Sequence, residues 1–266
     1  MTYKKYILST FSLLFFLANL SFAQRTQNLD QRIIVKPGIS AEIFNLTIGW
    51  DENVNTSKLK SYVFNTNTEI SFNSGFSVHI ILGYSLSNFD DLTFKELPFS
   101  IELGVKEIGG ILLGSEIYKR LFNLSDYEIN LYGQFVYYYG FDNEWDMPDL
   151  NVDGTLIGSP TWMRAQIGPS ISYLGLNSIS PFISATYNKL WGTFTVEQDI
   201  QDLLGTEEKK IKGKSNFAIT IGSEFVVTPK FSMSGAVSFL PYDGGIDLLG
   251  LLSIRYVIDT QNRRTP

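Results

Sequence analysis

The chain has 266 residues, of which 14% are aromatic, 18% are charged and none is cysteine. The lack of cysteine excludes disulfides, thiol catalysis and zinc–thiolate sites, so the chain must be stable through its own packing. Acidic residues outnumber basic ones, 27 to 21, and this balance argues against nucleic acid as a partner.

The first 23 residues have the pattern of a secretory signal peptide. Lys4 and Lys5 form a basic start, residues 7–20 are mostly apolar, and Ser21-Phe22-Ala23 matches a small-x-small cleavage site. The apolar stretch is shorter than the ~20 residues that a spanning helix needs, so cleavage is predicted in place of anchoring. Removal of this segment leaves 19 basic against 27 acidic residues, a net charge of −8.

After the signal segment, apolar and polar side chains alternate with period two. The clearest case is 127–140, YEINLYGQFVYYYG, in which odd positions are mostly aromatic or aliphatic and even positions include Glu128, Asn130 and Gln134. Period two predicts β-strands with one apolar and one polar face. The same pattern predicts ten strands, at 36–50, 60–72, 76–87, 98–119, 127–141, 161–175, 181–196, 216–227, 231–240 and 246–258.

The segment 98–119 leaves two interpretations open. Its apolar positions share one parity from Phe99 to Ile117, which fits one long, bulged strand. A hairpin at 106–110 is the alternative and would need another strand elsewhere. Since the strand number of such barrels is even, eight and twelve strands are the alternatives to ten.

Short and long connections alternate along the chain. Residues 73–75, 177–180 and 228–230 are predicted tight turns, rich in Asn, Ser, Gly and Pro. Long polar segments lie between the turns, at 51–60, 87–97, 142–160, 197–215 and 240–245. This asymmetry predicts an all-β, antiparallel transmembrane β-barrel with short periplasmic turns and long extracellular loops.

Aromatic residues gather near both ends of the predicted strands. Such rings favour the lipid interfaces, where an apolar ring and a polar tip are both accommodated. The predicted interface aromatics are Tyr62, Phe72, Phe76, Tyr84, Tyr127, Tyr139, Tyr173, Phe182, Trp191, Phe217, Phe231, Phe239 and Tyr256.

Three stretches, LSFAQ, VVTPKFSMSGAVSF and LLSIRYVI, resemble those of Gram-negative outer-membrane β-barrel proteins, in particular small barrels of Bacteroidota. The resemblance implies a signal peptide at 1–23, a barrel at 24–258 and a polar tail at 259–266. It also implies residence in the outer membrane after export through a cleaved signal peptide, with the lipid bilayer and the outer-membrane assembly machinery as partners. The polar tail departs from the aromatic end common in such families.

The polar face of the predicted barrel carries charges of both signs. A charge directed at lipid is costly, so we expect these side chains to form a polar network in the lumen. Its predicted members are Glu69, His79, Glu102, Lys106, Glu116, Glu128, Arg164, Glu224, Asp247 and Arg255. Because wide aqueous channels need about 16 strands or more, a narrow or plugged lumen is predicted.

His79 is the single histidine, so any histidine chemistry must use it. If residues 73–75 form a three-residue hairpin, Glu69 lies opposite His79 in the lumen. Barrel lipases and deacylases place a serine two residues after the histidine, but residue 81 is Ile. The chain is therefore predicted not to be an enzyme, and an outer-membrane hydrolase using His79 is kept as an alternative.

A partial calcium motif lies in the longest predicted loop. Asp149, Asn151 and Asp153, followed by Gly154, match the first half of a calcium-binding loop, but the twelfth position is Pro160 in place of the bidentate Glu. An ordinary turn is the favoured interpretation, a weak calcium site is the alternative, and no other cofactor is predicted.

The sequence thus predicts a non-enzymatic outer-membrane barrel with an envelope or surface role. A narrow porin-like channel for small solutes is the second hypothesis, and the hydrolase is the third. A soluble periplasmic β-protein is the rival at the level of the fold.

Overall fold

The computed structural model describes residues 33–50, 56–90, 92–97, 100–104, 106–145, 154–200 and 203–259. These residues form fifteen β-strands. Among them no helix is long and apolar enough to span a membrane. The predicted signal peptide and the tail from residue 260 lie outside the described residues, so both remain predictions.

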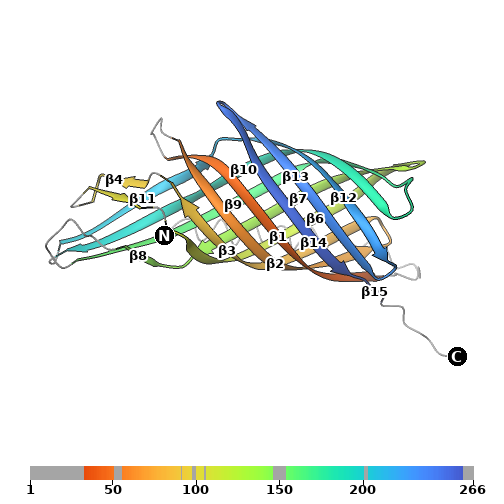
Figure 1. The fold of residues 1–266 in the computed structure, drawn as a ribbon, viewed down its shortest axis with the longest axis horizontal. Coiled ribbons are helices and arrows are strands. Elements are labelled where there is room, and N and C mark those ends of the chain that lie inside the picture. The colour runs from red at the N-terminus through yellow and green to blue at the C-terminus, as the bar shows by residue number, and fades with distance from the viewer. Residues whose placement is uncertain are drawn as a thin grey trace, which may run out of the picture. The chain divides into compact units, whose positions relative to one another are not determined.

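Ten of the strands pair in a closed antiparallel ring (Figure 1), which confirms the predicted fold class and strand number. In ring order they are β1 (Ile33–Trp50), β2 (Thr56–Phe72), β3 (Phe76–Phe89), β6 (Ile108–Leu124), β7 (Tyr127–Gly140), β9 (Gly154–Tyr173), β10 (Ile179–Ile200), β12 (Phe217–Thr228), β13 (Phe231–Tyr242) and β14 (Gly245–Tyr256). The ring closes because β14 pairs with β1, from Gly38↔Arg255 to Asn45↔Leu248.

The prediction for 98–119 was wrong. β5 (Ile101–Leu103) pairs with β4 (Leu92–Phe94) in a separate two-stranded sheet, and the ring strand β6 begins at Ile108. A hairpin at 106–110 does not form either, and the bulge of β6 lies between Arg120 and Phe122. Apolar residues alternate in the same way in a ring strand and in a small hairpin that packs on other strands. The alternation therefore could not show whether this segment belongs to the ring.

Three segments predicted as loops contain additional strands. β4 lies within 87–97, β8 (Asn143–Trp145) pairs with the first residues of β9, and β11 (Leu203–Gly213) pairs with the second half of β10. These strands mark the long-loop end of the barrel, at the left in Figure 1. Polar loops were predicted there because lysine, glutamate and glycine are frequent, yet main-chain pairing tolerates these side chains on an exposed face.

The opposite end of the barrel consists of short turns. In the turn between β2 and β3, the Gly75 amide donates a 3.1 Å hydrogen bond to the Phe72 carbonyl. Gly75 has φ +70°, a conformation that favours glycine. Phe72 pairs with Phe76 across the turn, as the predicted three-residue hairpin requires. Since β1 starts and β14 ends here, the short-turn end also holds both ends of the ring.

The ring contains fewer strands at the long-loop end. β10 pairs with β12 in its first half and with β11 in its second half. The other edge of β11 pairs directly with β1 at Ile48–Trp50. In the long-loop half, β11 therefore closes the ring, and β12, β13 and β14 are not part of it. The long-loop half is a ring of eight strands, β1, β2, β3, β6, β7, β9, β10 and β11, whereas the short-turn half has ten.

An eight-stranded interior is just wide enough to be filled by side chains. Two layers of rings fill it. In the layer nearer the short turns, Phe44 meets Trp162 edge to face, with centroids 5.6 Å apart, and Tyr138 stacks on Trp162 at 5.1 Å. In the outer layer Phe89 meets Phe194 at 5.3 Å, and Trp50 packs against both. We call these residues the apolar plug; further buried members are Leu46, Ile48, Leu59, Phe94, Ile108, Leu156, Leu190, Val196 and Ile211.

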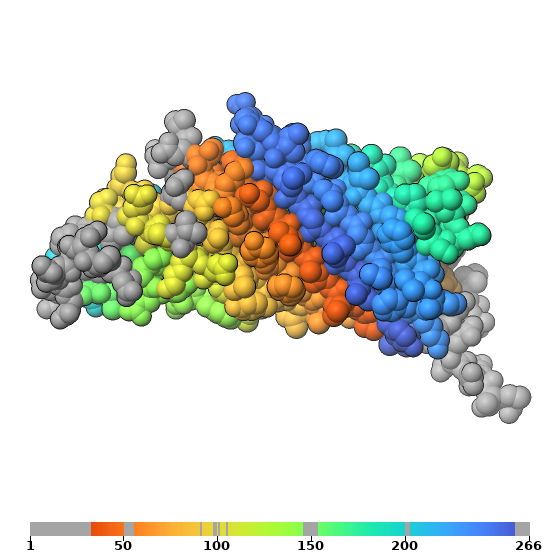
Figure 2. Space-filling model, viewed as in Figure 1, coloured from red at the N-terminus to blue at the C-terminus, as the bar shows by residue number. Residues whose placement is uncertain are grey.

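The outer face of the ring is apolar on every strand. In β7, Leu131 and Phe135 are exposed while Val136 and Tyr138 are buried, as the alternation predicts. Figure 2 shows the side chains of β1 packed beside those of β14 where the ring closes. Exposed apolar residues of the other strands include Ile39, Ile43, Phe64, Ile80, Leu82, Ile111, Leu113, Ile167, Ile171, Ile183, Ile221, Val237, Leu248 and Leu252. Soluble monomers rarely expose apolar patches of more than a few hundred Å².

One predicted interface aromatic points the other way. Phe182 on β10 lines the interior, whereas its neighbour Ile183 is 48% exposed. The prediction relied on the position of Phe182 beside a turn. Its parity is shared with the buried polar residues Ser184 and Thr186, and that signal was available in the sequence.

The fork where β14 leaves β1 is held by a buried carboxylate. Beyond Asn45 the main chain of β1 no longer pairs with β14, and pairing with β11 begins at Ile48. Asp247, 2% exposed, accepts hydrogen bonds from the Thr47 amide at 2.5 Å and the Thr47 hydroxyl at 2.8 Å. Lys58 Nζ lies 2.8 Å from the same carboxylate. These bonds replace the missing main-chain ladder.

We expect Asp247→Ala to lower the free energy of unfolding by about 2–3 kcal/mol, because hydrogen bonds to a charged group are lost and the Thr47 amide is left without its acceptor. Urea unfolding in detergent, followed by tryptophan fluorescence, measures this loss. Asp90→Ala is the control: the Lys60–Asp90 pair is 3.2 Å long but its lysine is 43% exposed, and such pairs contribute ~0–1 kcal/mol. Equal losses for both variants would contradict the role given to Asp247.

Candidate functional site: a polar cavity in the short-turn half

The ten-stranded half of the barrel encloses a cavity of about 640 Å³. At the short-turn end its wall begins with the turn residues Asn73 and Gly75. Toward the long-loop end it stops at Ile81, Leu112 and Val136, which belong to the buried apolar interior. The cavity is therefore a cup that is closed by the apolar plug.

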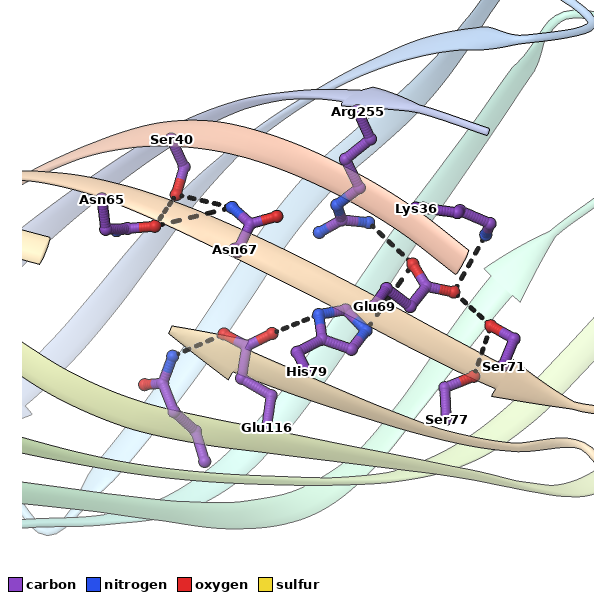
Figure 3. Close-up of polar contacts among 11 residues, drawn as sticks. Lys36, Ser40, Asn65, Asn67, Glu69, Ser71, Ser77, His79, Glu116 and Arg255 are labelled. Atoms are coloured by element: carbon purple, nitrogen blue, oxygen red, sulfur yellow. Dashed lines mark hydrogen bonds and ion pairs between the residues drawn. The ribbon is translucent and has the colours of Figure 1, made fainter. Parts of the chain in front are cut away.

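Glu69 is the centre of the polar network in this cavity (Figure 3). It lies directly opposite His79 in the β2–β3 hairpin, where the sequence placed it. Lys36 Nζ lies 2.9 Å from one carboxylate oxygen, and the Ser71 hydroxyl donates to the same oxygen at 2.5 Å. The other oxygen lies 3.6 Å from Arg255 Nη1. Three strands thus deliver cations and a hydroxyl to one carboxylate.

His79 lies between two carboxylates. Its Nε2 is 3.6 Å from Glu69 Oε2, and its Nδ1 is 3.0 Å from Glu116 Oε2. The imidazole is 3% exposed and packs against the ring of Tyr118 with centroids 5.1 Å apart. General-base catalysis on a serine hydroxyl requires a ring nitrogen within hydrogen-bond reach of that hydroxyl. Both nitrogens of His79 face carboxylates instead.

The network continues from Glu116 across the lumen. Gln134 donates to Glu116 at 2.7 Å, and Arg164 donates to Gln134 at 3.3 Å. Arg164 Nη1 lies 2.6 Å from Glu42 Oε1, and the arginine side chain is 2% exposed. Glu42 is on β1 and Arg164 is on β9, five places apart in a ring of ten. This ion pair therefore joins opposite walls of the barrel.

The same two strands meet again one step closer to the plug. Phe44 on β1 contacts Trp162 on β9, and the Arg164 guanidinium lies 5.3 Å above the Phe44 ring. The ion pair and the ring pair mark the level at which the polar cavity ends and the apolar plug begins. Low dielectric surroundings strengthen the attraction of such a pair but also raise the cost of leaving either charge alone.

Seven residues predicted for the lumen line this cavity: Glu69, His79, Glu116, Glu128, Arg164, Glu224 and Arg255. An eighth, Asp247, is buried at the fork between β1 and β14 and does not line the cavity. Glu128 lies 3.4 Å from Arg120, which is 45% exposed.

Two predicted members lie outside the lumen. Glu102 is exposed on β5, which is not a ring strand, and Lys106 is an exposed loop residue whose ammonium group donates to the Glu144 carbonyl. Both were assigned inward parity because 98–119 was treated as a single strand. Because β5 is not a ring strand, the alternation of inward and outward side chains along β6 does not predict where Glu102 and Lys106 point.

The sequence interpretation missed Lys36, Glu42 and Gln134 as members of the network. All three have the inward parity of their strands. Glu42, however, shares its parity with Phe44 and Leu46, which are apolar and also point inward. A strand that passes from the polar cavity into the apolar plug has two apolar faces in its second half, so alternation alone does not identify its inner face.

The partial calcium motif at Asp149, Asn151 and Asp153 lies outside the described residues. Calcium binding there remains the weak alternative stated from the sequence.

No family model and no curated protein matches the chain. Solved structures of outer-membrane barrels do match. The outer membrane protease OmpT from Escherichia coli has 12% identity and a TM-score of 0.49, covering 88% of this chain and 100% of that chain. The translocator domain of the autotransporter NalP from Neisseria meningitidis has 8% identity and a TM-score of 0.40, covering 95% and 97%.

A major outer membrane protein from Thermus thermophilus also matches, with 12% identity and a TM-score of 0.39, covering 86% of this chain and 100% of that chain. Identities and scores this low carry nothing about activity. The fold follows from the chain's own closed strand ring and its apolar outer face.

We expect Arg164→Ala to cost about 3–5 kcal/mol of unfolding free energy, because Glu42 is then a buried charge without a partner. Arg164→Leu combined with Glu42→Leu removes both charges and is expected to restore at least half of that loss. Urea unfolding in detergent compares the three proteins. Arg120→Ala serves as the control, because its pair with Glu128 is largely exposed and should contribute ~0–1 kcal/mol. A double variant as unstable as Arg164→Ala would refute the account.

Proposed function

We propose that this outer-membrane β-barrel protein has an envelope or surface role, without catalysis and without passing solutes through its lumen. In this proposal the short turns face the periplasm and the long-loop end faces the cell surface. The apolar plug is the observation that carries the proposal, because it fills the eight-stranded half of the barrel with side chains that are almost fully buried.

The plug disfavours the porin-like alternative. Trp50, Phe89 and Phe194 form one layer, and Phe44 with Trp162 forms a second, so a solute would have to displace both. Barrels with wide aqueous channels have about 16 strands or more. A ring that narrows from ten strands to eight leaves no such space.

The geometry of His79 supports a role without catalysis. Its two ring nitrogens lie 3.6 Å and 3.0 Å from Glu69 and Glu116. A hydrolase that used His79 would first have to release one of these contacts. The position of His79 in the cup on the short-turn side would also keep it from substrates at the cell surface.

Contacts between the β4–β5 segment and β11 at the long-loop end support the surface role. The β4–β5 hairpin is tied to β11, because the Glu96 amide donates to Glu207 at 2.7 Å and Lys209 donates to the Thr93 carbonyl. Lys209 also lies 5.1 Å above the Phe94 ring. Strands that are fixed to one another in this way can contact a partner at a lower entropic cost than flexible segments.

We expect the wild-type protein to produce no conductance steps above background in a planar bilayer, because both layers of the plug block the lumen. Phe44→Ala combined with Trp162→Ala removes one layer and should enlarge the cup, yet it should stay closed because the layer of Trp50, Phe89 and Phe194 remains. Steady steps from the wild-type protein would sink the proposal of a closed barrel.

Residence in the bilayer has its own test. Spin labels at Leu113, Leu131 and Phe135, which point outward from β6 and β7, are expected to collide with oxygen dissolved in lipid in reconstituted vesicles. A label at Val136, which is buried in the interior, should be protected from oxygen and serves as the control. Labels at the outward positions that instead collide with a water-soluble nickel reagent would rule out lipid contact.

A further inference from the structure

Three lysines gather on the outer face of the barrel where the eight-stranded half begins. Lys189 lies on β10, Lys212 lies on β11, and Lys214 directly follows β11. All three are exposed. They have the outward parity of their strands, since Leu190 and Ile211 are buried in the apolar plug. We call these three residues the lysine patch.

Strand register brings the side chains of the lysine patch together. Lys212 pairs with Trp191 of β10 on one side and with Gly49 of β1 on the other. Lys189 Nζ lies 5.9 Å from the centre of the Trp191 ring. Lys214 reaches Gly49, because a Cβ at this glycine would lie 2.8 Å from Lys214 Nζ. The ammonium groups of Lys189 and Lys214 therefore lie on the two sides of Lys212, one strand away in each direction.

No acidic side chain compensates the lysine patch among the residues that the structure describes. On the neighbouring strand β2, Lys58 and Lys60 lie 2.8 Å and 3.2 Å from Asp247 and Asp90. Within the described ranges the three patch lysines form no such ion pair. Like charges on neighbouring strands repel each other. An anion between the ammonium groups would remove this repulsion.

The lysine patch lies next to aromatic residues of the outer face. Tyr187 of β10 pairs with Phe217 of β12, and both rings are exposed. Lys189 follows Tyr187 by two residues toward the long-loop end, and Lys214 precedes Phe217 by three. Aromatic rings favour the boundary between hydrocarbon and headgroups. Lysine side chains that start at this boundary can place their ammonium groups among the headgroups.

We propose that the lysine patch binds the phosphate group of an anionic lipid. The phosphate oxygens accept hydrogen bonds from the three ammonium groups, and the acyl chains lie along the apolar outer face. This lipid belongs to the leaflet at the long-loop end, which is the outer leaflet in the proposed orientation. The inference goes beyond the proposed surface role. It depends on residence in the bilayer and not on the filled lumen, so a conductance recording and lipid binding are separate readouts.

Trp191 is a built-in probe of the lysine patch. Trp50 and Trp162 are buried and Trp145 lies on β8, whereas Trp191 faces outward beside Lys212. The full-length protein is reconstituted in phosphatidylcholine vesicles that contain either brominated phosphatidylglycerol or brominated phosphatidylcholine, because bromine quenches a tryptophan that it contacts. The Trp191→Phe variant gives the background from the other tryptophans. The two quenching curves yield the binding constant of the anionic lipid relative to the zwitterionic lipid.

We expect the wild-type protein to prefer phosphatidylglycerol at Trp191 about tenfold or more, because each lysine near an anionic headgroup contributes a factor of about five. Lys212→Gln combined with Lys214→Gln should reduce this preference about tenfold. Lys119→Gln combined with Lys230→Gln removes the same charge near the short turns and is the matched control. Equal quenching of the wild-type protein by the two lipids, or an unchanged preference in the first double variant, overturns the proposal.

Two further measurements separate a lipid site from other roles of the lysines. Inorganic phosphate should affect the preference no more than sodium chloride at equal ionic strength, since the lipid is also held by its chains. Loss of the preference with phosphate alone indicates a site for free anions and overturns the lipid proposal. In zwitterionic detergent the Lys212→Gln, Lys214→Gln variant should resist urea at least as well as the wild-type protein, because repulsion is removed. Earlier unfolding of this variant assigns the lysines a structural role and also overturns the proposal.

Discussion

Closure of the sheet is the constraint on which the rest of this structure depends. In hydrocarbon no water is present to satisfy main-chain amides and carbonyls, so the strands must pair all the way round. The number of strands in the closed ring then sets the width of the interior. Here that number changes along the barrel axis, because the β13–β14 hairpin belongs to the ring only in the short-turn half. The eight-stranded half is filled with side chains, and the ten-stranded half has room for a cavity.

The polar network follows from this change of width. Charged groups in the interior need partners or water, and only the wider half provides both. At the boundary between the halves, Arg164 Nη1 and Glu42 Oε1 meet across the lumen, 2.6 Å apart. Phe44 and Trp162 meet across the lumen one step closer to the long-loop end. At the fork between β1 and β14, Asp247 supplies the hydrogen bonds that the separated main chains cannot make. Each contact compensates for a place where the regular barrel is interrupted.

The functional consequences have the same origin. In the proposed function, the filled long-loop half prevents the barrel from acting as a pore. The β13–β14 hairpin lines the short-turn half with small polar residues, among them Ser234, Ser238 and Ser253, and with Arg255. At the long-loop end, hydrogen bonds from Glu96 to Glu207 and from Lys209 to Thr93 tie the segment of β4 to β11.

The sequence by itself determined the class of fold, the number of ring strands, the position of nine of them, three short turns and the Glu69–His79 pairing. These depend on local alternation and on one tight turn, and both can be read along the chain. Only the tertiary structure decided which half of the lumen is polar, where Glu102 and Lys106 lie, and that Glu42 meets Arg164. Strand β1 has Glu42, Phe44 and Leu46 on one face, and the sequence of β1 does not predict which strand lies opposite it across the lumen. The opposite strand depends on how many strands complete the closed ring, which is a property of the tertiary structure.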